Sequence, residues 1–279
     1  MVQDGSTTTE YDIPYIPNNP SPLLRFDLYA PDACPRDSPL LVFVHGGAWR
    51  AEDKADNDFR TLASRLASAS NCPVLVPNYR LTTEHNQFRH PGHAADILAF
   101  LVFLTTWPGV PNVFDPAGRP MYLMGHSAGA HILTSIFLDS AHVFPSLTPP
   151  SPVLQAVRAI VLSEGIYDID LLLARFPEYR GWFIAAAFGD RESYADVSTT
   201  SLSLREGSDL RWLVIHSAGD TLVDMPQSDT MDAHLRGLYG PAADTRVARN
   251  FDQLDVDHDD VLRSPLFVDV VRAFVDGLQ

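Results

Sequence analysis

One five-residue pattern, G-x-S-x-G at residues 125–129, limits the folds open to this chain more than any other segment, and Ser127 is its centre. A short apolar run at 122–124 precedes the pattern, and an apolar segment without helix breakers follows at 130–138. A strand that turns sharply into a helix at such a pattern lifts the serine hydroxyl clear of its sheet, and glycines relieve the crowding there. We therefore predict a strand, a turn with an accessible serine, and a helix.

Strand and helix patterns alternate along the rest of the chain. Apolar runs predict strands at 23–29, 40–44, 73–77, 157–162, 212–215 and 246–251. Helical spacing predicts helices at 58–69, 93–105, 226–239 and 261–278, and a proline-rich linker spans 146–152. This alternation implies an α/β protein with a mostly parallel sheet that helices cover on both faces.

We expect residues 1–279 to form a single domain. Residues 1–22 are polar and contain four prolines, which predicts an extended lead-in rather than a packed element. Residues 169–204 contain apolar helical pieces rich in aromatic side chains. That segment is too small for a second domain, and we expect a short helical cap over the strand ends.

Composition restricts the partners. The formal charge of −15, without a block of lysine and arginine, disfavours nucleic acid and anionic membrane surfaces. The longest apolar run, 97–104, is far shorter than the ~20 residues of a membrane-spanning helix. Two cysteines and an N-terminus unlike a signal peptide favour a cytoplasmic protein. We expect a small-molecule substrate as partner, with a homodimer as the assembly to test.

A serine hydroxyl becomes nucleophilic beside a base, and the base needs an acid that orients it. With a serine in this strand–helix turn, the usual chain order is serine, acid, histidine. Only one histidine after Ser127, His258, falls in a polar loop between the last strand and the last helix, and we predict it as the base. The other candidates lie in or near helices or end a strand: His131, His142, His216 and His234.

Asp220 is the predicted acid, because it follows a buried strand by a Ser-Ala-Gly turn and so reaches the carboxyl edge of the sheet. Asp224 is its rival, but it lies near the start of the next helix, where an aspartate is often only a helix-end charge. Asp257 and Asp259 flank His258, and we interpret both as solvated loop charges.

The oxyanion of acyl transfer needs preorganised N–H donors. The segment His45-Gly46-Gly47-Ala48-Trp49 follows a buried strand and exposes backbone N–H groups at its glycines. We predict an oxyanion hole formed by Gly46, Gly47, Ala48 and Ala128.

Metal and cofactor patterns are weak. His85, His90 and His93 lack a cysteine or carboxylate that would complete a ligand set. Residues 255–260 lack the glycine and glutamate of a calcium loop, and no G-x-G-x-x-G follows a strand. We predict no metal and no cofactor.

The chain resembles the α/β-hydrolase superfamily and, within it, the eukaryotic kynurenine formamidases. The resemblance rests on HGGAW at 45–49, the helix entry at 57–59, NYRL at 78–81, GHSAGA at 125–130, EGIYD at 164–168 and PEY at 177–179. It spans the chain from about the first strand to the last helix. Ala48 stands where general carboxylesterases usually have a third glycine.

This resemblance implies hydrolysis of N-formyl-L-kynurenine to L-kynurenine and formate. Ser127 would attack the formyl carbon, His258 would transfer the proton and Asp220 would orient His258. Cap and loop aromatics, among them Trp49, Tyr167 and Phe183, would face the substrate. A carboxylesterase for aryl or short acyl esters is the alternative enzyme, and a noncatalytic binding protein on the same scaffold is the alternative outside catalysis.

Overall fold

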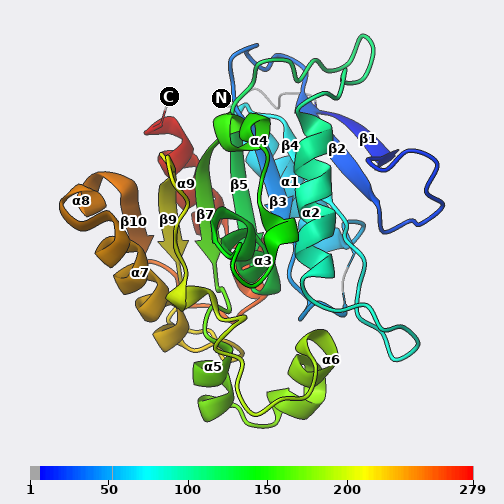
Figure 1. The fold of residues 1–279 in the computed structure, drawn as a ribbon. Helices are drawn as coiled ribbons and strands as arrows, with labels where there is room; N and C mark the ends of the chain where they lie inside the picture. The colour runs from blue at the N-terminus through cyan, green and yellow to red at the C-terminus, as the bar shows by residue number, and fades with distance from the viewer. Residues whose placement is uncertain (1–6, 52, 279) are drawn as a thin grey trace.

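A computed structural model describes residues 7–51 and 53–278, and its centre is one twisted sheet (Figure 1). The spatial order of the eight strands is β1-β2-β4-β3-β5-β7-β9-β10. The strands β1 and β2 are antiparallel to their neighbours, and every pairing from β4 to β10 is parallel. In chain order the strands are β1 (Thr7–Pro14), β2 (Arg25–Pro31), β3 (Leu40–Val44), β4 (Val74–Pro77), β5 (Met121–His126), β7 (Val157–Ser163), β9 (Arg211–Ile215) and β10 (Val247–Asn250).

Helices cover both faces of this sheet. They are α1 (Asn57–Ser70), α2 (Gly92–Leu104), α3 (Ala128–Phe137), α4 (Ser151–Ala156), α5 (Ile169–Arg175), α6 (Ala185–Phe188), α7 (Met225–Tyr239), α8 (Ala243–Arg246) and α9 (Pro265–Asp276). Alternate residues of β3 show the two layers: Leu41 and Phe43 pack with α1 and α9, whereas Leu40, Val42 and Val44 face α2, α3 and α7. The predicted α/β class is confirmed.

Most predicted elements are confirmed to within two or three residues, but three predictions are wrong. Residues 7–14 of the expected lead-in form β1, an edge strand, where the terminal Pro14 is tolerated; residues 1–6 lie outside the described part. The linker at 146–152 overlaps a 3₁₀ turn (Pro145–Leu147) and the start of α4. The predicted last helix is divided, because Pro265 begins α9 after a separate 3₁₀ turn (Asp260–Arg263).

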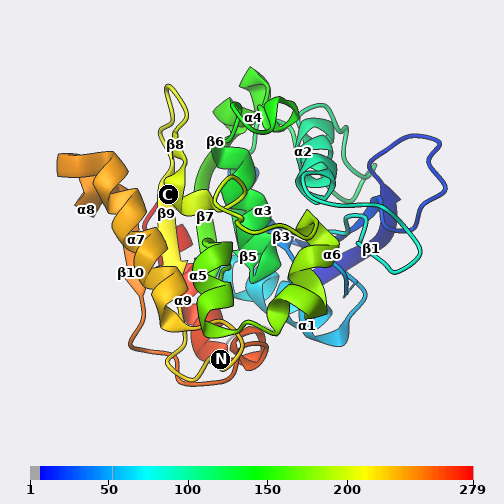
Figure 2. The same cartoon turned by 60° about the horizontal axis from the view of Figure 1, so that its bottom comes forward.

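The segment at 169–204 lies over the carboxyl ends of the parallel strands. The arrowheads of β7 and β9 point toward α5 in Figure 1, and Figure 2 brings α5 and α6 to the front of these ends. Between these helices lies a π-helical turn (Arg180–Ile184), and a two-stranded ribbon of β6 (Leu138–Asp139) and β8 (Ser203–Leu204) closes the segment.

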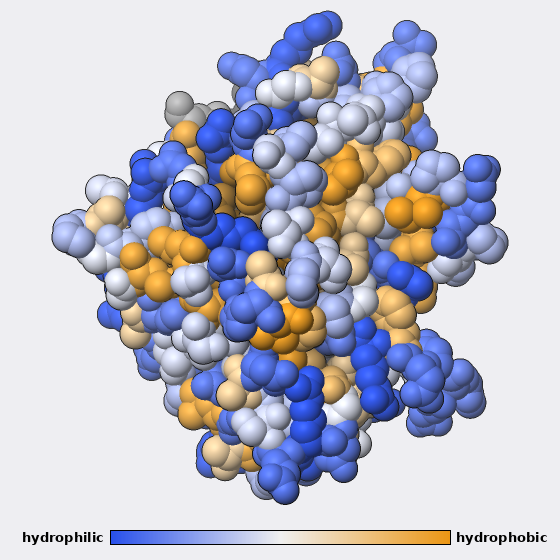
Figure 3. Space-filling model, viewed as in Figure 1, coloured by the Kyte–Doolittle hydropathy of each residue, from blue (hydrophilic) through white to orange (hydrophobic). Residues whose placement is uncertain are grey.

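The surface in Figure 3 is mostly hydrophilic, as expected when the apolar residues pack inside against the sheet. On the face shown in Figure 3, hydrophobic residues form separated patches within a mostly hydrophilic surface. No helix in the described part is long and apolar enough to cross a bilayer.

Candidate active site

Ser127 occupies a strained turn between β5 and α3. Its φ of 55° lies in the left-handed region, which a non-glycine residue rarely adopts. A Cβ on Gly125 would lie 2.6 Å from the carbonyl oxygen of Gly129, and a Cβ on Gly129 would lie 2.2 Å from that of Val44. Both flanking glycines are therefore required by close backbone contacts, as the sequence pattern predicts.

His258 and Asp220 lie together at the same edge of the sheet. The Nδ1 atom of His258 is 2.6 Å from Oδ2 of Asp220, whose side chain is fully buried. The other oxygen of Asp220 accepts hydrogen bonds from the backbone N–H groups of Leu222 (2.8 Å) and Val223 (2.9 Å). Burial opposes ionisation of Asp220, but its hydrogen bonds, first that from His258, lower its pKa to about 2.

Short contacts join the two loops that carry this pair. The Ser217 hydroxyl donates to the carbonyl of Val256 (2.6 Å) and accepts from its N–H (2.8 Å). A Cβ on Gly219 would lie 2.9 Å from the Val256 backbone, so only glycine permits this approach. Thr221 donates from its hydroxyl to Asp257 Oδ1 (2.8 Å). These contacts fix the position of the loop that carries Asp220 relative to the loop that carries His258.

The rival acids lie elsewhere. Asp224 is the N-terminal flanking residue of α7, as the sequence predicts, and makes no cap hydrogen bond through its side chain. The Asp257 carboxylate accepts from Thr221 and from the backbone of His258, and Asp259 lies 3.7 Å from Nε2 of His126. Among the described residues, Asp220 is thus the carboxylate bonded to the His258 ring.

The other histidines after Ser127 have separate surroundings. Three of them contact groups outside the pocket: His131 the Val197 carbonyl (2.9 Å), His216 the Ser228 hydroxyl (2.8 Å) and His234 the Leu202 carbonyl (2.7 Å). His142 is exposed after α3.

The loop after β3 lies against Ser127. A Cβ on Gly46 would be 3.0 Å from Cβ of Ser127, and Gly47, Ala48 and Trp49 follow with φ of 86°, 53° and 60°. Within residues 7–51 and 53–278, the N–H groups of Gly46, Gly47, Ala48 and Ala128 donate no backbone hydrogen bond. The predicted oxyanion donors are therefore unused and adjacent to the serine.

Two aromatic groups hold this loop in place. The Tyr79 hydroxyl donates to the carbonyl of Gly46 (2.8 Å), and the ring of His45 stacks on that of Tyr79 at 4.5 Å between centroids. Burial lowers the pKa of His45 to about 4, so it is neutral near pH 7. The role of Tyr79 is not visible in the sequence, because only the folded chain brings its hydroxyl to the Gly46 carbonyl.

A cavity of about 380 Å³ opens at Ser127 and His258. This volume lies in the usual range for small-molecule sites. Its apolar wall consists of Ile166, Tyr179, Trp182, Phe183, Leu222 and Val223. Phe183 thus lies where the sequence predicts. Trp49 and Tyr167 do not line the cavity; both are fully buried, and Trp49 packs on His131 and Phe188. Their predicted place in the pocket wall is corrected to the core.

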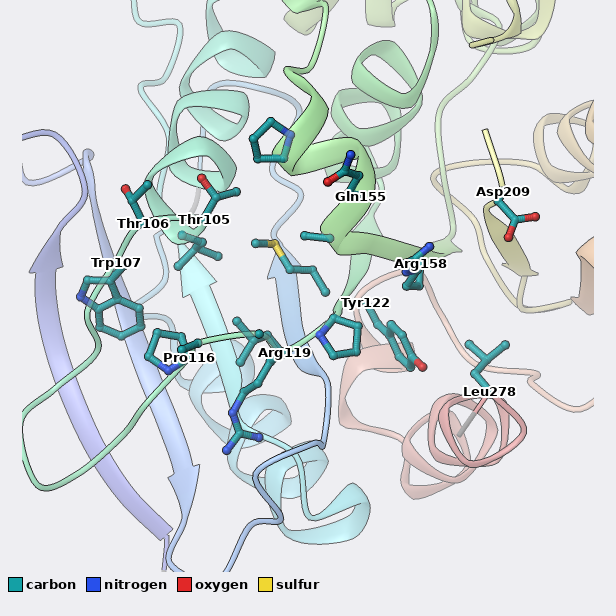
Figure 4. Close-up of a pocket in the computed structure, with 18 of the residues that line it drawn as sticks. Thr105, Thr106, Trp107, Pro116, Arg119, Tyr122, Gln155, Arg158, Asp209 and Leu278 are labelled. Carbon is teal, nitrogen blue, oxygen red and sulfur yellow. The ribbon is translucent and has the colours of Figure 1, made fainter. Parts of the chain in front are cut away.

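A larger hollow of about 1070 Å³ lies at the opposite, amino-terminal edge of the sheet (Figure 4). It is lined by Trp107, Arg119, Tyr122 and Arg158, among others, at or before the starts of strands. Neither Ser127 nor His258 lines it. Because the reactive groups of parallel α/β sheets gather at the carboxyl ends of the strands, we place the active site in the smaller cavity.

Glu164 is a functional candidate that the sequence analysis missed. It directly follows β7 with φ of 49°, is fully buried, and accepts from the Ser217 N–H at 2.9 Å. Burial raises the pKa of Glu164 well above its usual value, and a hydrogen bond to Asp220 raises it further. Both effects favour the protonated form of Glu164, which can donate to the Asp220 carboxylate. A carboxylate directly after a buried central strand was the available signal.

The ring of His126 packs against that of His258. The ring centroids are 4.8 Å apart, and burial lowers the pKa of His126 to about 4. Two groups at this edge have metal-like spacing, His126 with His258 and Asp259, and Glu164 with His216 and Asp220. Both contain a member of the His258–Asp220 pair, whose facing atoms are already joined, so we assign neither to an ion.

Comparison with known proteins agrees with this geometry. A profile of the BD-FAE family matches residues 26–235. The kynurenine formamidase of Meyerozyma guilliermondii is 28% identical over 243 residues, which cover 85% of this chain and 86% of that protein. The kynurenine formamidase of Eremothecium gossypii is 30% identical over 70% of this chain and 78% of its own length.

The fold also matches solved structures. The crystal structure of esterase B from Lactobacillus rhamnosis superposes with a TM-score of 0.74 at 17% identity, covering 100% of this chain and 87% of that one. At this identity the match establishes the fold, which is that of an esterase-type α/β-hydrolase.

Proposed function

Because the chain belongs to the BD-FAE family and has the α/β-hydrolase fold, we propose that it hydrolyses N-formyl-L-kynurenine to L-kynurenine and formate. The observation that carries the reaction type is the His258–Asp220 contact of 2.6 Å beside a cavity that Ser127 also lines. The kynurenine formamidases of Meyerozyma guilliermondii and Eremothecium gossypii, 28% and 30% identical, support the substrate.

In the proposed mechanism, Ser127 Oγ attacks the formyl carbon while Nε2 of His258 takes its proton. Asp220 accepts from Nδ1–H and stabilises the imidazolium that forms. The oxyanion receives hydrogen bonds from the unused N–H groups of the 46–48 loop and of Ala128. His258 then protonates the leaving aryl nitrogen, and kynurenine departs from the formyl-serine.

Water completes the cycle. It attacks the formyl-serine as His258 removes a proton, and collapse of the second tetrahedral intermediate releases formate and restores the Ser127 hydroxyl. Each half-reaction consumes and returns one proton at His258, so the enzyme ends unchanged. The leaving group needs room for an aryl ring, which the aromatic wall of the cavity supplies.

The substrate test compares kcat/KM for N-formyl-L-kynurenine with kcat/KM for p-nitrophenyl acetate. We expect the formamide to be preferred; a much higher value for the ester would establish the carboxylesterase alternative. A fluorophosphonate should label the wild-type serine and leave Ser127→Ala unlabelled. Folded protein that resists labelling would indicate a noncatalytic scaffold.

A matched pair of variants tests which aspartate orients His258. Asp220→Asn should lower kcat by about 10⁴-fold, since the wrong tautomer of His258 is then held. Asp224→Asn keeps His258 bonded to Asp220 and should change kcat little. The opposite ranking would assign the role to Asp224.

The proposal includes a location and an assembly. We infer a cytoplasmic enzyme without a nucleic-acid partner; free thiols at Cys34 and Cys72 fit a reducing compartment, and the charge of −15 opposes binding to phosphates. Multi-angle light scattering tests the homodimer.

A further inference from the structure

The active-site cavity contains two fixed charges of opposite sign. Among the lining residues that the structure describes, Arg50 is the cation and Asp259 is the anion; apart from His258, the other described lining residues are uncharged. Arg50 follows the oxyanion loop directly, and Asp259 follows His258. Each charge therefore stands beside one part of the reacting machinery, within reach of a ligand bound there.

Arg50 is only partly used within the protein. It is half-buried, and its Nη1 donates to the backbone carbonyl of Trp182 in the cap. Across residues 7–51 and 53–278, no carboxylate lies within ion-pair distance of Arg50. A guanidinium carries five N–H donors in a planar fork that matches a carboxylate. The contact with Trp182 leaves donors for such a ligand.

Asp259 is an exposed, ionised carboxylate. Its side chain is 56% exposed, and its one ion-pair contact in the described part is with Nε2 of His126, at 3.7 Å. His126 is fully buried and neutral near pH 7, because burial lowers its pKa to about 4. His126, and at longer range His258 and Arg263, lower the pKa of Asp259, so its carboxylate stays ionised. No lysine or arginine in the described part lies within ion-pair distance of this carboxylate, and it lines the cavity.

The same cavity has an aromatic wall. Tyr179, Trp182 and Phe183 pack on one another with ring centroids 5.1 to 5.2 Å apart. Trp182 is 52% exposed, an unusual position for a large aromatic side chain unless a ligand covers it. The Tyr179 hydroxyl, bonded to the Leu222 carbonyl at 3.0 Å, ties this wall to the acid loop.

We propose that Arg50 and Asp259 are specificity-determining residues that bind the carboxylate and the ammonium group of an α-amino-acid substrate. This inference rests on the proposed function. N-formyl-L-kynurenine carries a formamide on its aryl ring and a zwitterionic amino acid on a short side chain. The formamide meets Ser127, the ring packs on the aromatic wall, and the two charged groups meet charges of opposite sign.

Three substrates test this assignment. N-formyl-L-kynurenine carries both charges, 4-(2-formamidophenyl)-4-oxobutanoate keeps only the carboxylate, and N-(2-acetylphenyl)formamide has neither. All three present the same formanilide with an ortho ketone. Ratios of kcat/KM between them cancel any general effect of a variant on His258 or on the cap.

Arg50→Gln should lower the ratio of the zwitterion to the neutral formamide by about 10- to 100-fold, the usual loss for a charged hydrogen bond. Asp259→Asn should lower the ratio of the zwitterion to the oxobutanoate by about 5- to 50-fold. The matched control is Arg175→Gln, an exposed arginine of α5 outside the cavity, which should leave both ratios unchanged.

The test separates failure of this inference from failure of the proposed function. If the wild type hydrolyses N-formyl-L-kynurenine but neither variant changes its ratio, Arg50 and Asp259 do not select the zwitterion, and the proposed function stands. If the wild type hydrolyses p-nitrophenyl acetate and not N-formyl-L-kynurenine, the proposed function fails and this inference fails with it. Thermal unfolding of each variant checks that it is folded.

Discussion

Two carboxyl groups whose pKa values shift in opposite directions meet at the base of the active site. Asp220 is ionised, because its hydrogen bonds lower its pKa to about 2 in spite of burial, whereas burial and Asp220 together raise the pKa of Glu164 well above its usual value. Like charges at this depth disfavour ionisation of both carboxyl groups. A proton on Glu164 leaves a single negative charge, on the residue bonded to His258.

Glu164 is a positioning residue by this argument, and its variants should separate hydrogen bonding from charge. Glu164→Gln can still donate to Asp220 and accept from the Ser217 N–H, so kcat/KM for N-formyl-L-kynurenine should stay within about fivefold of wild type. Glu164→Ala leaves both partners unpaired and should lower it by about 10- to 100-fold. Steady-state kinetics decide; a glutamine variant as impaired as the alanine variant would contradict a neutral Glu164.

At the scale of elements, the site depends on how closely α3 approaches the end of β3. Gly129 is the second residue of α3, and no side chain fits between it and the carbonyls of Val44 and His45. The same approach brings the 46–48 loop to Ser127. The nucleophile and the oxyanion donors are thus placed by one helix–strand contact.

Gly129→Ala should destabilise the protein by at least about 3 kcal/mol, because its Cβ would lie 2.2 Å from the Val44 carbonyl oxygen and the backbone would have to move. Gly181→Ala is the control, since no heavy atom lies within 4 Å of a Cβ there, and it should be neutral or stabilising by up to about 1 kcal/mol. Urea unfolding measures both. Equal effects at the two positions would show that the contact is looser than this.

The elements could be predicted because buried parallel strands are continuous apolar runs and the helices between them are periodic. Ser127 is predictable from its G-x-S-x-G pattern between a strand and a helix, Asp220 from the turn that follows a buried strand, and His258 from the polar loop between the last strand and the last helix. Glu164 and Tyr79 were missed as contributors, because their roles depend on which strands become neighbours. Trp49 and Tyr167 were misplaced, since sequence alone does not distinguish an aromatic side chain in a pocket wall from one in the core beneath it.

At the scale of the whole molecule, the interior contains several neutral histidines. Burial lowers the pKa of His45, His126 and His131 to about 4, and that of His93 to about 3. They hold loops, helices and the cap together through stacking and carbonyl contacts. In the unfolded chain the same side chains titrate near pH 6.5.

The protein should therefore unfold in mild acid. Above pH 6.5 these histidines are neutral in both states; below it the unfolded state binds more protons, so each costs about 1.4 kcal/mol of stability per pH unit until pH 4. Glu164 has the opposite effect on stability, because its pKa is raised in the folded state. Above the pKa that Glu164 has in the unfolded chain, this offsets the contribution of about one histidine. Against a total free energy of unfolding of about 5–15 kcal/mol, this predicts loss of near-UV circular dichroism between about pH 5 and pH 4.

His126→Gln should reduce the slope of unfolding free energy against pH by about 1.4 kcal/mol per unit, measured by urea titration, whereas His142→Gln, at an exposed loop position, should not. A stability that is flat from pH 7 to pH 4.5 would contradict neutral buried histidines.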